Sequence, residues 1–168
     1  MGFRLLCCAV IITCATFIGL ELRRSMLTRA ESLAFFREYF RSVRSYILHT
    51  GMSLDDISDI LGKAADCREF CRFLREETRH SSYSASFSAA LGRWRSSLCL
   101  TEGDVQMLCS TAGNIGTSDT DHALDVLLLA DEQLSELLNA AQSKALTDGR
   151  LYVVLSVSSG AVAALLLL

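Results

Sequence analysis

Hydrophobic residues are concentrated at the two ends of the chain, and charged residues lie between them. Residues 5–20 (LLCCAVIITCATFIGL) and residues 151–168 (LYVVLSVSSGAVAALLLL) contain no charged side chain. Of the 16 Lys and Arg residues and 19 Asp and Glu residues, only Arg4 lies outside residues 21–150. As helices, the two apolar runs would be about 24 Å and about 27 Å long, close to the ~30 Å hydrocarbon core of a membrane. The pattern predicts a transmembrane helix at each end of a charged domain, residues 21–150.

Arginines beside the apolar runs predict the side of the membrane on which this central domain lies. Arg23 and Arg24 follow the first run, and Arg150 precedes the second. Positive side chains that flank transmembrane helices are enriched on the cytoplasmic side. They also disfavour a cleaved secretory signal, which ends in a small-residue cleavage site. The sequence therefore predicts an uncleaved amino-terminal anchor, a returning carboxy-terminal helix and a cytoplasmic central domain.

The central domain has the spacing of amphipathic helices throughout, and the whole chain contains no proline. Its clearest apolar stripe advances in steps of three and four residues: Leu33, Phe36, Phe40, Val43 and Ile47. Further helices are expected from Leu54, from about Asp66 to Arg79, around Ala89–Trp94, after Thr101 and from about Asp119 to Asp148. The expected fold class is all-α, an antiparallel bundle of about six helices flanked by the two transmembrane helices.

Residues with known capping preferences mark the ends of these helices. Gly51 is suited to end the first helix in a left-handed conformation, and Ser53 with Asp56 is suited to begin the second. Thr101 is suited to cap the fifth helix and Ser118 the last. The serine-rich residues 80–88 (HSSYSASFS) predict a loosened chain before the fourth helix.

Charge is shared unevenly within the central domain. Residues 23–95 contain 13 basic and nine acidic side chains, whereas residues 96–148 contain one basic and nine acidic side chains. Two interpretations are open: the charged faces are simply solvated, or an acidic face docks a basic partner. In the second case, Asp131 and Glu132 are candidate docking residues. The acidic second half also argues against nucleic acid as a partner.

Cys67 and Cys71 are the strongest candidates for metal or redox chemistry. They lie four residues apart on one predicted helix face, with His80 nearby. A structural zinc site needs four ligands, and no second pair stands at a suitable spacing. Because free cysteine is among the most buried residue types, small core residues are the favoured interpretation.

Other candidate chemistry is weaker. The run of Asp119, Asp121 and Asp125 with His122 is better explained as carboxylates that complement a helix start than as a cation site. The chain contains no phosphate loop, nucleophile elbow or HExxH motif. We therefore expect no catalytic residue, no cofactor, no metal and no small-molecule substrate.

Four stretches carry motifs of a recognisable kind. IGLELRRSMLTRAESL contains an Ile-Gly pair at the membrane exit (Gly19) and then Arg29, and Met52-Ser53-Leu54 forms a short turn. LTEGDVQMLCSTAGNIGTSD contains Leu-Thr-x-x-Asp followed by Gly-x-x-Gly-x-x-Asp, and the apolar ending has a tyrosine, a glycine and a leucine run. The motif residues in these last two stretches are Thr101, Asp104, Gly113, Gly116, Asp119 and Gly160. Over nearly the whole chain, these motifs resemble the stage III sporulation protein AB family of endospore-forming bacteria.

The resemblance implies a location and partners. Family members belong to a membrane complex between mother cell and forespore, so the chain would lie in the mother-cell membrane with its central domain in the cytoplasm. The family is similar to the inner-membrane platform proteins of type II secretion and type IV pilus machines, whose helical domains contact an assembly ATPase. Expected partners are therefore a secretion-type sporulation ATPase and other membrane proteins of the same complex. The chain itself would be a non-enzymatic assembly or coupling component.

The same resemblance gives the glycine motif a structural role. Gly113 and Gly116 would allow the chain to reverse between two helices, and Ser118 or Asp119 would cap the next helix. Two alternative functions stay open. One is a membrane-anchored protein that handles a metal or redox partner with Cys67 and Cys71. The other is a general two-anchor scaffold unrelated to sporulation.

Overall fold

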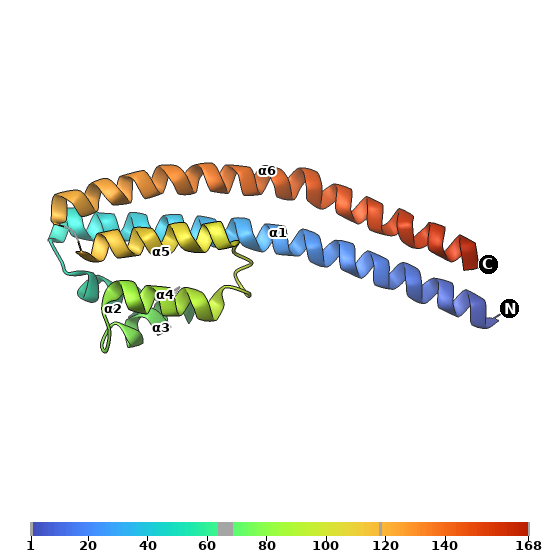
Figure 1. Ribbon diagram of the computed structural model, residues 1–168, viewed down its shortest axis with the longest axis horizontal. Helices are drawn as coiled ribbons and strands as arrows, with labels where there is room; N and C mark the ends of the chain where they lie inside the picture. The colour runs from blue at the N-terminus through green and yellow to red at the C-terminus, as the bar shows by residue number, and fades with distance from the viewer. Residues whose placement is uncertain (1, 64–68, 118, 168) are drawn as a thin grey trace. The chain divides into compact units, whose positions relative to one another are not determined.

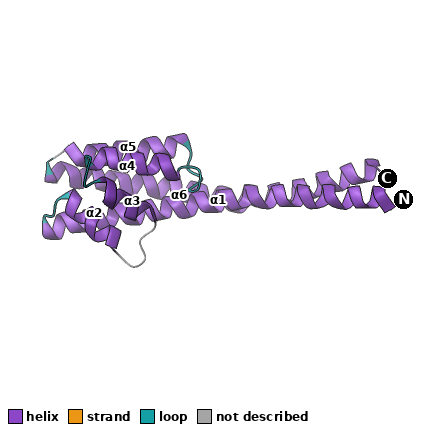
Figure 2. Cartoon of the chain, turned by 90° about the horizontal axis from the view of Figure 1, so that it is seen from below, coloured by secondary structure: helices purple, strands orange, loops and turns teal. Residues whose placement is uncertain are grey.

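Figure 1 shows a computed structural model of the chain. It describes the backbone of residues 2–63, 69–117 and 119–167, and the side chains of all of these except residues 2–8, 117 and 164–167. The described residues form helices and no strand (Figure 2): α1 (Gly2–Thr50), α2 (Leu54–Lys63), α3 (Glu69–Glu77), α4 (Tyr83–Trp94), α5 (Glu102–Thr117) and α6 (Thr120–Leu167). The prediction of an all-α fold with about six helices is confirmed.

Helix α4 begins earlier than the sequence pattern predicts. The serine-rich interval does not loosen the chain, because most of it belongs to the first turns of this helix. Ser86 Oγ donates to the carbonyl of Ser82 at 3.0 Å, and Ser88 Oγ donates to the carbonyl of Ala85 at 2.9 Å. These bonds satisfy the hydroxyls within the helix, and burial of Phe87 fixes the helix on the core. The expected start of α3 near Asp66 lies outside the described residues.

Contacts divide the chain into two units, and both long helices supply residues to each. Unit 1 contains the residues up to Glu31 and those from Leu137 onward, and unit 2 contains Ser32–Glu136. In unit 2, α2 packs on α3, α3 packs on α4, and α4 packs on α5.

Aromatic side chains form the centre of unit 2. The rings of Phe36 on α1 and Phe70 on α3 meet edge to face, with centroids 5.1 Å apart. Phe87 of α4 contacts both, at 6.1 Å and 5.3 Å. The predicted apolar stripe of α1 lies within this core, since Leu33, Phe36, Phe40, Val43 and Ile47 are all buried. Edge-to-face ring contacts add to the free energy gained by burying these side chains.

Unit 1 is an antiparallel pair of helical segments that meet through small residues. A β-carbon placed on Gly19 would lie 2.1 Å from Ser156 Oγ, and one placed on Gly160 would lie 2.9 Å from the β-carbon of Ala15. Further along, a β-carbon on Gly149 would lie 3.1 Å from Cγ of Arg23. The two backbones therefore approach more closely here than larger side chains would allow.

Large apolar side chains of unit 1 point away from this contact. Phe17 is 69% exposed and Ile18 is 59% exposed on α1, while Val154 is 66% exposed and Val162 is 58% exposed on α6. Small residues thus lie between the two segments and large apolar residues lie outside them. This distribution is the reverse of that in unit 2, where large apolar residues are buried.

The membrane-spanning character predicted for the two ends is not confirmed by the described residues. Within that part of the chain, no helix includes a stretch that is both long enough and apolar enough to cross a membrane. The side chains of residues 5–8 and 164–168, which belong to the two predicted transmembrane helices, lie outside the described set.

Candidate functional site

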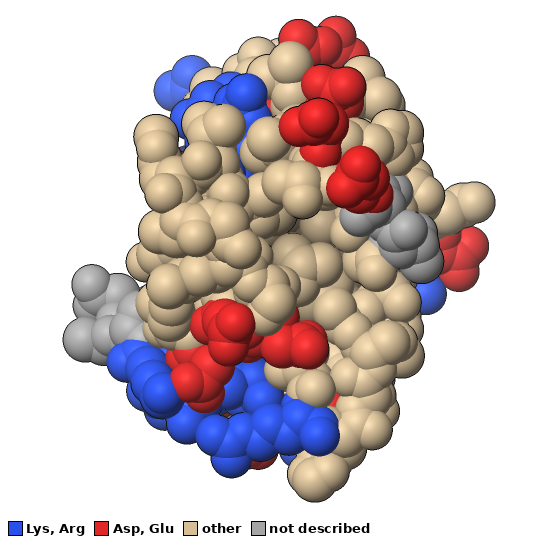
Figure 3. All heavy atoms as spheres, turned by 90° about the vertical axis from the view of Figure 1, so that its left-hand side faces the viewer, with Lys and Arg blue, Asp and Glu red and all other residues tan. Residues whose placement is uncertain are grey.

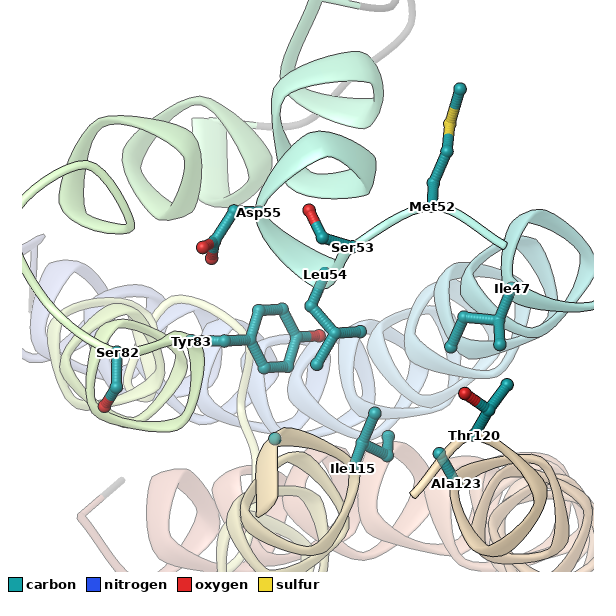
Figure 4. A pocket seen from close by; sticks show the side chains of 11 residues that line it. Ile47, Met52, Ser53, Leu54, Asp55, Ser82, Tyr83, Ile115, Thr120 and Ala123 are labelled. Carbon is teal, nitrogen blue, oxygen red and sulfur yellow. The ribbon is translucent and has the colours of Figure 1, made fainter. Parts of the chain in front are cut away.

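A pocket of about 410 Å³ lies in unit 2, where one end of each of α1, α2, α4, α5 and α6 meets (Figure 4). Its apolar lining is contributed by Ile47, Met52, Leu54, Ile115 and Ala123. Its polar lining is contributed by Ser53, Asp55, Ser82, Tyr83 and Thr120, and Gly116 completes the wall. We call this the end pocket.

Helix ends determine the shape of the end pocket. Gly51 has a φ of +61° and its amide donates to the carbonyl of Ile47 at 3.1 Å, which ends α1 in the predicted left-handed conformation. Two residues later, the Ser53 hydroxyl donates to Asp56 Oδ2 at 2.7 Å, and the Asp56 amide donates to Ser53 Oγ at 3.3 Å. These bonds fix the first turn of α2 at the mouth of the pocket. The short turn at Met52 and Ser53 is therefore tightly defined.

The pocket has a rigid apolar floor. Ile47, Tyr83, Ile115 and Ala123 are all buried. The hydroxyl groups of Tyr83 and Tyr39 lie 3.1 Å apart and share a hydrogen bond, so the Tyr83 ring stands fixed as one wall. Figure 4 shows Tyr83 beside Leu54, with Ile115 opposite and Met52 pointing away from the pocket. Burial raises the pKa of both tyrosines, so both stay neutral, and Tyr83 adds no charge to the pocket.

Exposed carboxylates surround this floor. Asp55 is the one charged residue among the described side chains that line the pocket, and it lies in the first turn of α2 with Asp56. Asp121 lies in the first turn of α6, next to the lining residue Thr120. Figure 3, which faces this end of unit 2, shows acidic groups above and below a mainly uncharged central surface, with Lys and Arg groups beside the lower ones and at the upper left. A hollow of mixed apolar and polar lining with carboxylates at its edge suits a protein segment that carries an apolar side chain between Lys or Arg residues.

The residues of the third sequence motif are distributed along α5 and the start of α6. Thr101 and Asp104 form the predicted cap, since the Thr101 amide donates to Asp104 Oδ2 at 2.9 Å and the Asp104 amide donates to Thr101 Oγ1 at 3.2 Å. Asp119 Oδ1 accepts from the Thr120 amide at 2.9 Å, and its carbonyl accepts from the Ala123 amide, so Asp119 begins α6. Ser118, the alternative cap, lies outside the described residues.

The turn role predicted for Gly113 and Gly116 is wrong. Both lie within the helical turns of α5, and neither has a positive φ. A β-carbon on Gly113 would meet nothing within 4 Å, and one on Gly116 would lie 4.0 Å from the β-carbon of Ser84. The chain reverses after Thr117, so neither glycine is needed for the reversal.

The other motif residues lie in unit 1. Gly19 and Gly160 form part of its close helix contact. Arg29 also lies in this unit, on α1, and is half-buried. Motif residues are thus found at the start of α5, at the end pocket and in unit 1, and they do not form one site.

The cysteine hypothesis gains no support from the described residues. Cys71 is buried in the core, His80 is exposed, and Cys67 lies outside the described residues. Among described side chains, no three of His, Cys, Asp and Glu are grouped closely enough to hold a metal ion. The acidic run of Asp119, Asp121 and Asp125 with His122 forms no such group either.

The carboxylate of Asp131, one of the two candidate docking residues, is bound within the chain. It accepts from Arg41 Nε at 2.7 Å and from Arg37 Nε at 2.8 Å, and these bonds lower its pKa to about 2. Both arginines also donate through Nη2 to its second oxygen, at 3.1 Å and 3.4 Å. Asp131 therefore joins α6 to α1, whereas its neighbour Glu132 is exposed. The i and i+4 spacing of the arginines shows that they share a helix face, but only the fold reveals their common partner.

Comparison with known proteins identifies the family of the chain. No curated protein and no solved structure matches it. The family model described as stage III sporulation protein AB matches residues 4–168, which is essentially the whole chain. The match covers both long helices and every motif residue discussed above. On this match, the chain belongs to the stage III sporulation protein AB family.

Proposed function

We propose that the chain is a non-enzymatic membrane component of the complex between mother cell and forespore, and that it serves a secretion ATPase as a platform-like assembly or coupling protein. Family membership supports the role in sporulation. The reversed polarity of unit 1, with small residues inside and large apolar residues outside, is the observation that carries the membrane part of the proposal. The resemblance to secretion and pilus platform proteins supports the role with an ATPase.

The polarity of unit 1 fits lipid better than water. Phe17, Ile18, Val154 and Leu155 are each more than half exposed. Apolar side chains clustered in this way are unfavourable in water unless another surface covers them. In a bilayer, lipid covers them, and helices associate instead through close contacts of Gly, Ala and Ser. The contact of Gly19 with Ser156 is of this type. The polarity of unit 1 therefore supports a membrane location for this unit. The family resemblance supports the mother-cell membrane, and the arginines beside the apolar runs support a cytoplasmic central domain.

Membrane attachment can be tested with the full chain. After an alkaline wash of membranes from expressing cells, we expect the chain to stay in the pellet. Replacing Phe17 and Val154 together by Asp should move it to the wash, because lipid-facing carboxylates are costly. Leu48→Asp with Leu129→Asp is the matched control, since both leucines are more than half exposed but lie in unit 2. Release of the unaltered chain by the wash contradicts the proposal.

The end pocket supports contact with a protein partner, and the ATPase is the partner that the family resemblance suggests. The pocket offers a fixed apolar floor and carboxylates at its rim, which fits a basic segment with an apolar anchor. Asp55 and Asp121 are exposed, and neither carboxylate forms a capping bond among the described residues, so their charges can be reversed without loss of such a bond.

A binding measurement tests this assignment. We expect Asp55→Lys with Asp121→Lys to weaken binding of the full chain to a secretion-type ATPase encoded beside its gene by roughly tenfold, since each rim charge contributes on the order of 0.5–1 kcal/mol. Glu132→Lys, on an exposed part of α6, is the comparison variant. A loss caused by Glu132→Lys alone would place the contact on that face of α6. The absence of such an ATPase from the gene neighbourhood would favour the general scaffold.

A further inference from the structure

A second hollow of unit 2, separate from the end pocket, lies between α1 and α6. Its volume is also about 410 Å³. From α1 it is lined by Arg41, Arg44, Leu48 and His49, with Ser45 between them, and from α6 by Leu127 and Asp131. We call this the arginine groove. None of its lining residues lines the end pocket.

The charges in the arginine groove are not balanced within the described chain. The carboxylate of Asp131 is bound by Arg37 and Arg41, each through Nε and Nη2. Glu38 is the other carboxylate that acts on Arg41. These two acidic residues offset two arginines, and Arg44 is left as an additional positive charge beside His49. An acidic ligand is the complement of such a groove.

Arg44 also has an unsatisfied hydrogen-bond donor. Its Nε is buried and has no hydrogen-bond partner among the described residues. A guanidinium is usually satisfied when Nε and one terminal nitrogen face a carboxylate together, as Arg37 and Arg41 face Asp131. A buried donor without an acceptor carries a free-energy penalty that an incoming carboxylate would remove. Because Arg44 lines the groove, a carboxylate that entered the groove would meet this guanidinium.

The rest of the groove sets the spacing of the ligand. Leu48 lies one helical turn after Arg44 and is 56% exposed, so its side chain is accessible to a ligand in the groove. Leu127 forms the opposite wall from α6 and is buried. An apolar side chain placed between these leucines would lie one turn away from a carboxylate on Arg44. A helix with Glu or Asp four residues from Leu, Ile or Phe has this spacing.

We propose that the arginine groove docks an acidic amphipathic helix of a partner protein, with its carboxylate on Arg44 and an apolar side chain against Leu48. The proposal differs from the contact proposed at the end pocket in both place and charge, since the end pocket fits a basic segment. It therefore stands or falls independently of the ATPase assignment.

Two synthetic helical peptides test the proposal. They are identical except for Glu or Lys at the position four residues from a Leu, and a fluorescent label reports their binding to the full chain in mild detergent. We expect the Glu peptide to bind at least about fivefold more tightly than the Lys peptide, the effect of one partly buried ion pair. Arg44→Glu should reverse the preference, and Arg44→Gln should abolish it.

Arg72→Glu is the matched control, because Arg72 is exposed on α3 and does not line the groove. It should leave the preference for the Glu peptide unchanged. Circular dichroism melting shows whether each variant is folded. If Arg44→Glu does not fold, Arg44→Gln alone tests the role of Arg44. Equal binding of the two peptides, or a Glu preference that survives both Arg44 substitutions, overturns the proposal. So does a dimer in sedimentation that Arg44→Glu dissociates, since the groove would then bind a second copy of this chain.

Discussion

Asp131 Oδ1 lies 2.8 Å from Arg37 Nε, and this ion pair joins α6 to α1 within unit 2. About a quarter of each side chain is exposed, 24% for Asp131 and 25% for Arg37. The carboxylate also receives Arg41, so it holds two guanidinium groups at once. We expect this carboxylate to contribute more to stability than an exposed ion pair does, because its removal leaves two cations on one helix face without their common partner.

The first prediction concerns the loss of this charge. A pKa of about 2 for Asp131, against an ordinary 3.8, corresponds to roughly 2 kcal/mol. Solvent screening of a partly exposed group reduces the expected effect to about 1 kcal/mol. We expect Asp131→Asn to lower the thermal unfolding midpoint by a few degrees at pH 7, measured by circular dichroism. Glu132→Gln, at the neighbouring exposed position, should leave the midpoint unchanged. Equal effects of the two substitutions would show that the ion pairs of Asp131 with Arg37 and Arg41 do not stabilise the fold.

The second prediction concerns acid. Because the folded-state pKa of Asp131 is lowered, its contribution to stability is fully present above pH 4 and is lost as the pH falls toward 2. Asp59 behaves in the same way, since its bonds to Lys63 and Arg75 lower its pKa to about 2. We therefore expect the free energy of unfolding to fall between pH 4 and pH 2. The fall should be shallower in Asp131→Asn, and an identical slope in the two proteins would contradict this account.

The third prediction concerns the buried tyrosine pair. Tyr39 and Tyr83 are both 5% exposed, and their hydroxyl groups are 3.1 Å apart. Tyr39→Phe leaves the hydroxyl of Tyr83 buried without this partner, and Tyr83→Phe does the same to Tyr39. Each single change should cost about 1–3 kcal/mol. The double change should cost less than the sum, because no unpaired hydroxyl remains; purely additive losses in a double-mutant cycle would show that the two hydroxyls are not coupled.

Local patterns in the sequence predict much of unit 2. The stripe from Leu33 to Ile47, the left-handed Gly51 and the cap formed by Thr101 with Asp104 depend on residues within one or two turns, and all are confirmed. The start of α4 is predicted less well than its end at Trp94, because serine also favours loops. The start of α4 is determined by the hydrogen bonds of its serine hydroxyls to carbonyls within the helix and by the packing of Phe87 on Phe36 of α1 and Phe70 of α3.

Features formed between distant segments could not be predicted in this way. The bonds of Asp131 span 90 and 94 positions, and the end pocket collects residues from five helices. The sequence contains no local signal that identifies a partner at such a distance. The helical state of Gly113 and Gly116 was missed for a related reason. Two glycines three residues apart are typical of turns, but a glycine in a helix costs only about 1 kcal/mol relative to alanine, which tertiary contacts can offset.

The fourth prediction concerns the close helix contact in unit 1. A β-carbon on Gly19 would lie 2.1 Å from Ser156 Oγ and 3.1 Å from its β-carbon. Gly19→Ala should therefore force the two segments apart and lower the unfolding midpoint of the full chain in mild detergent. Adding Ser156→Gly removes both atoms and should restore much of the loss. If Gly19→Ala is harmless by itself, the two segments do not meet at this point.

The fifth prediction separates the glycines of α5 from Gly19. Gly113 is helical, and a β-carbon placed on it would meet nothing within 4 Å. Gly113→Ala should be neutral or stabilise the protein by up to about 1 kcal/mol, because alanine is the better helix former and loses less backbone entropy on folding. Gly92, in α4 and equally unobstructed, is the matched control and should respond in the same direction. A loss of stability at Gly113 but not at Gly92, measured by thermal unfolding, would show that Gly113 needs a conformation or contact that only glycine permits. If Gly113→Ala instead leaves folding intact and weakens binding of a partner, the partner must approach α5 at this position, because the space that the new methyl group would occupy is otherwise empty.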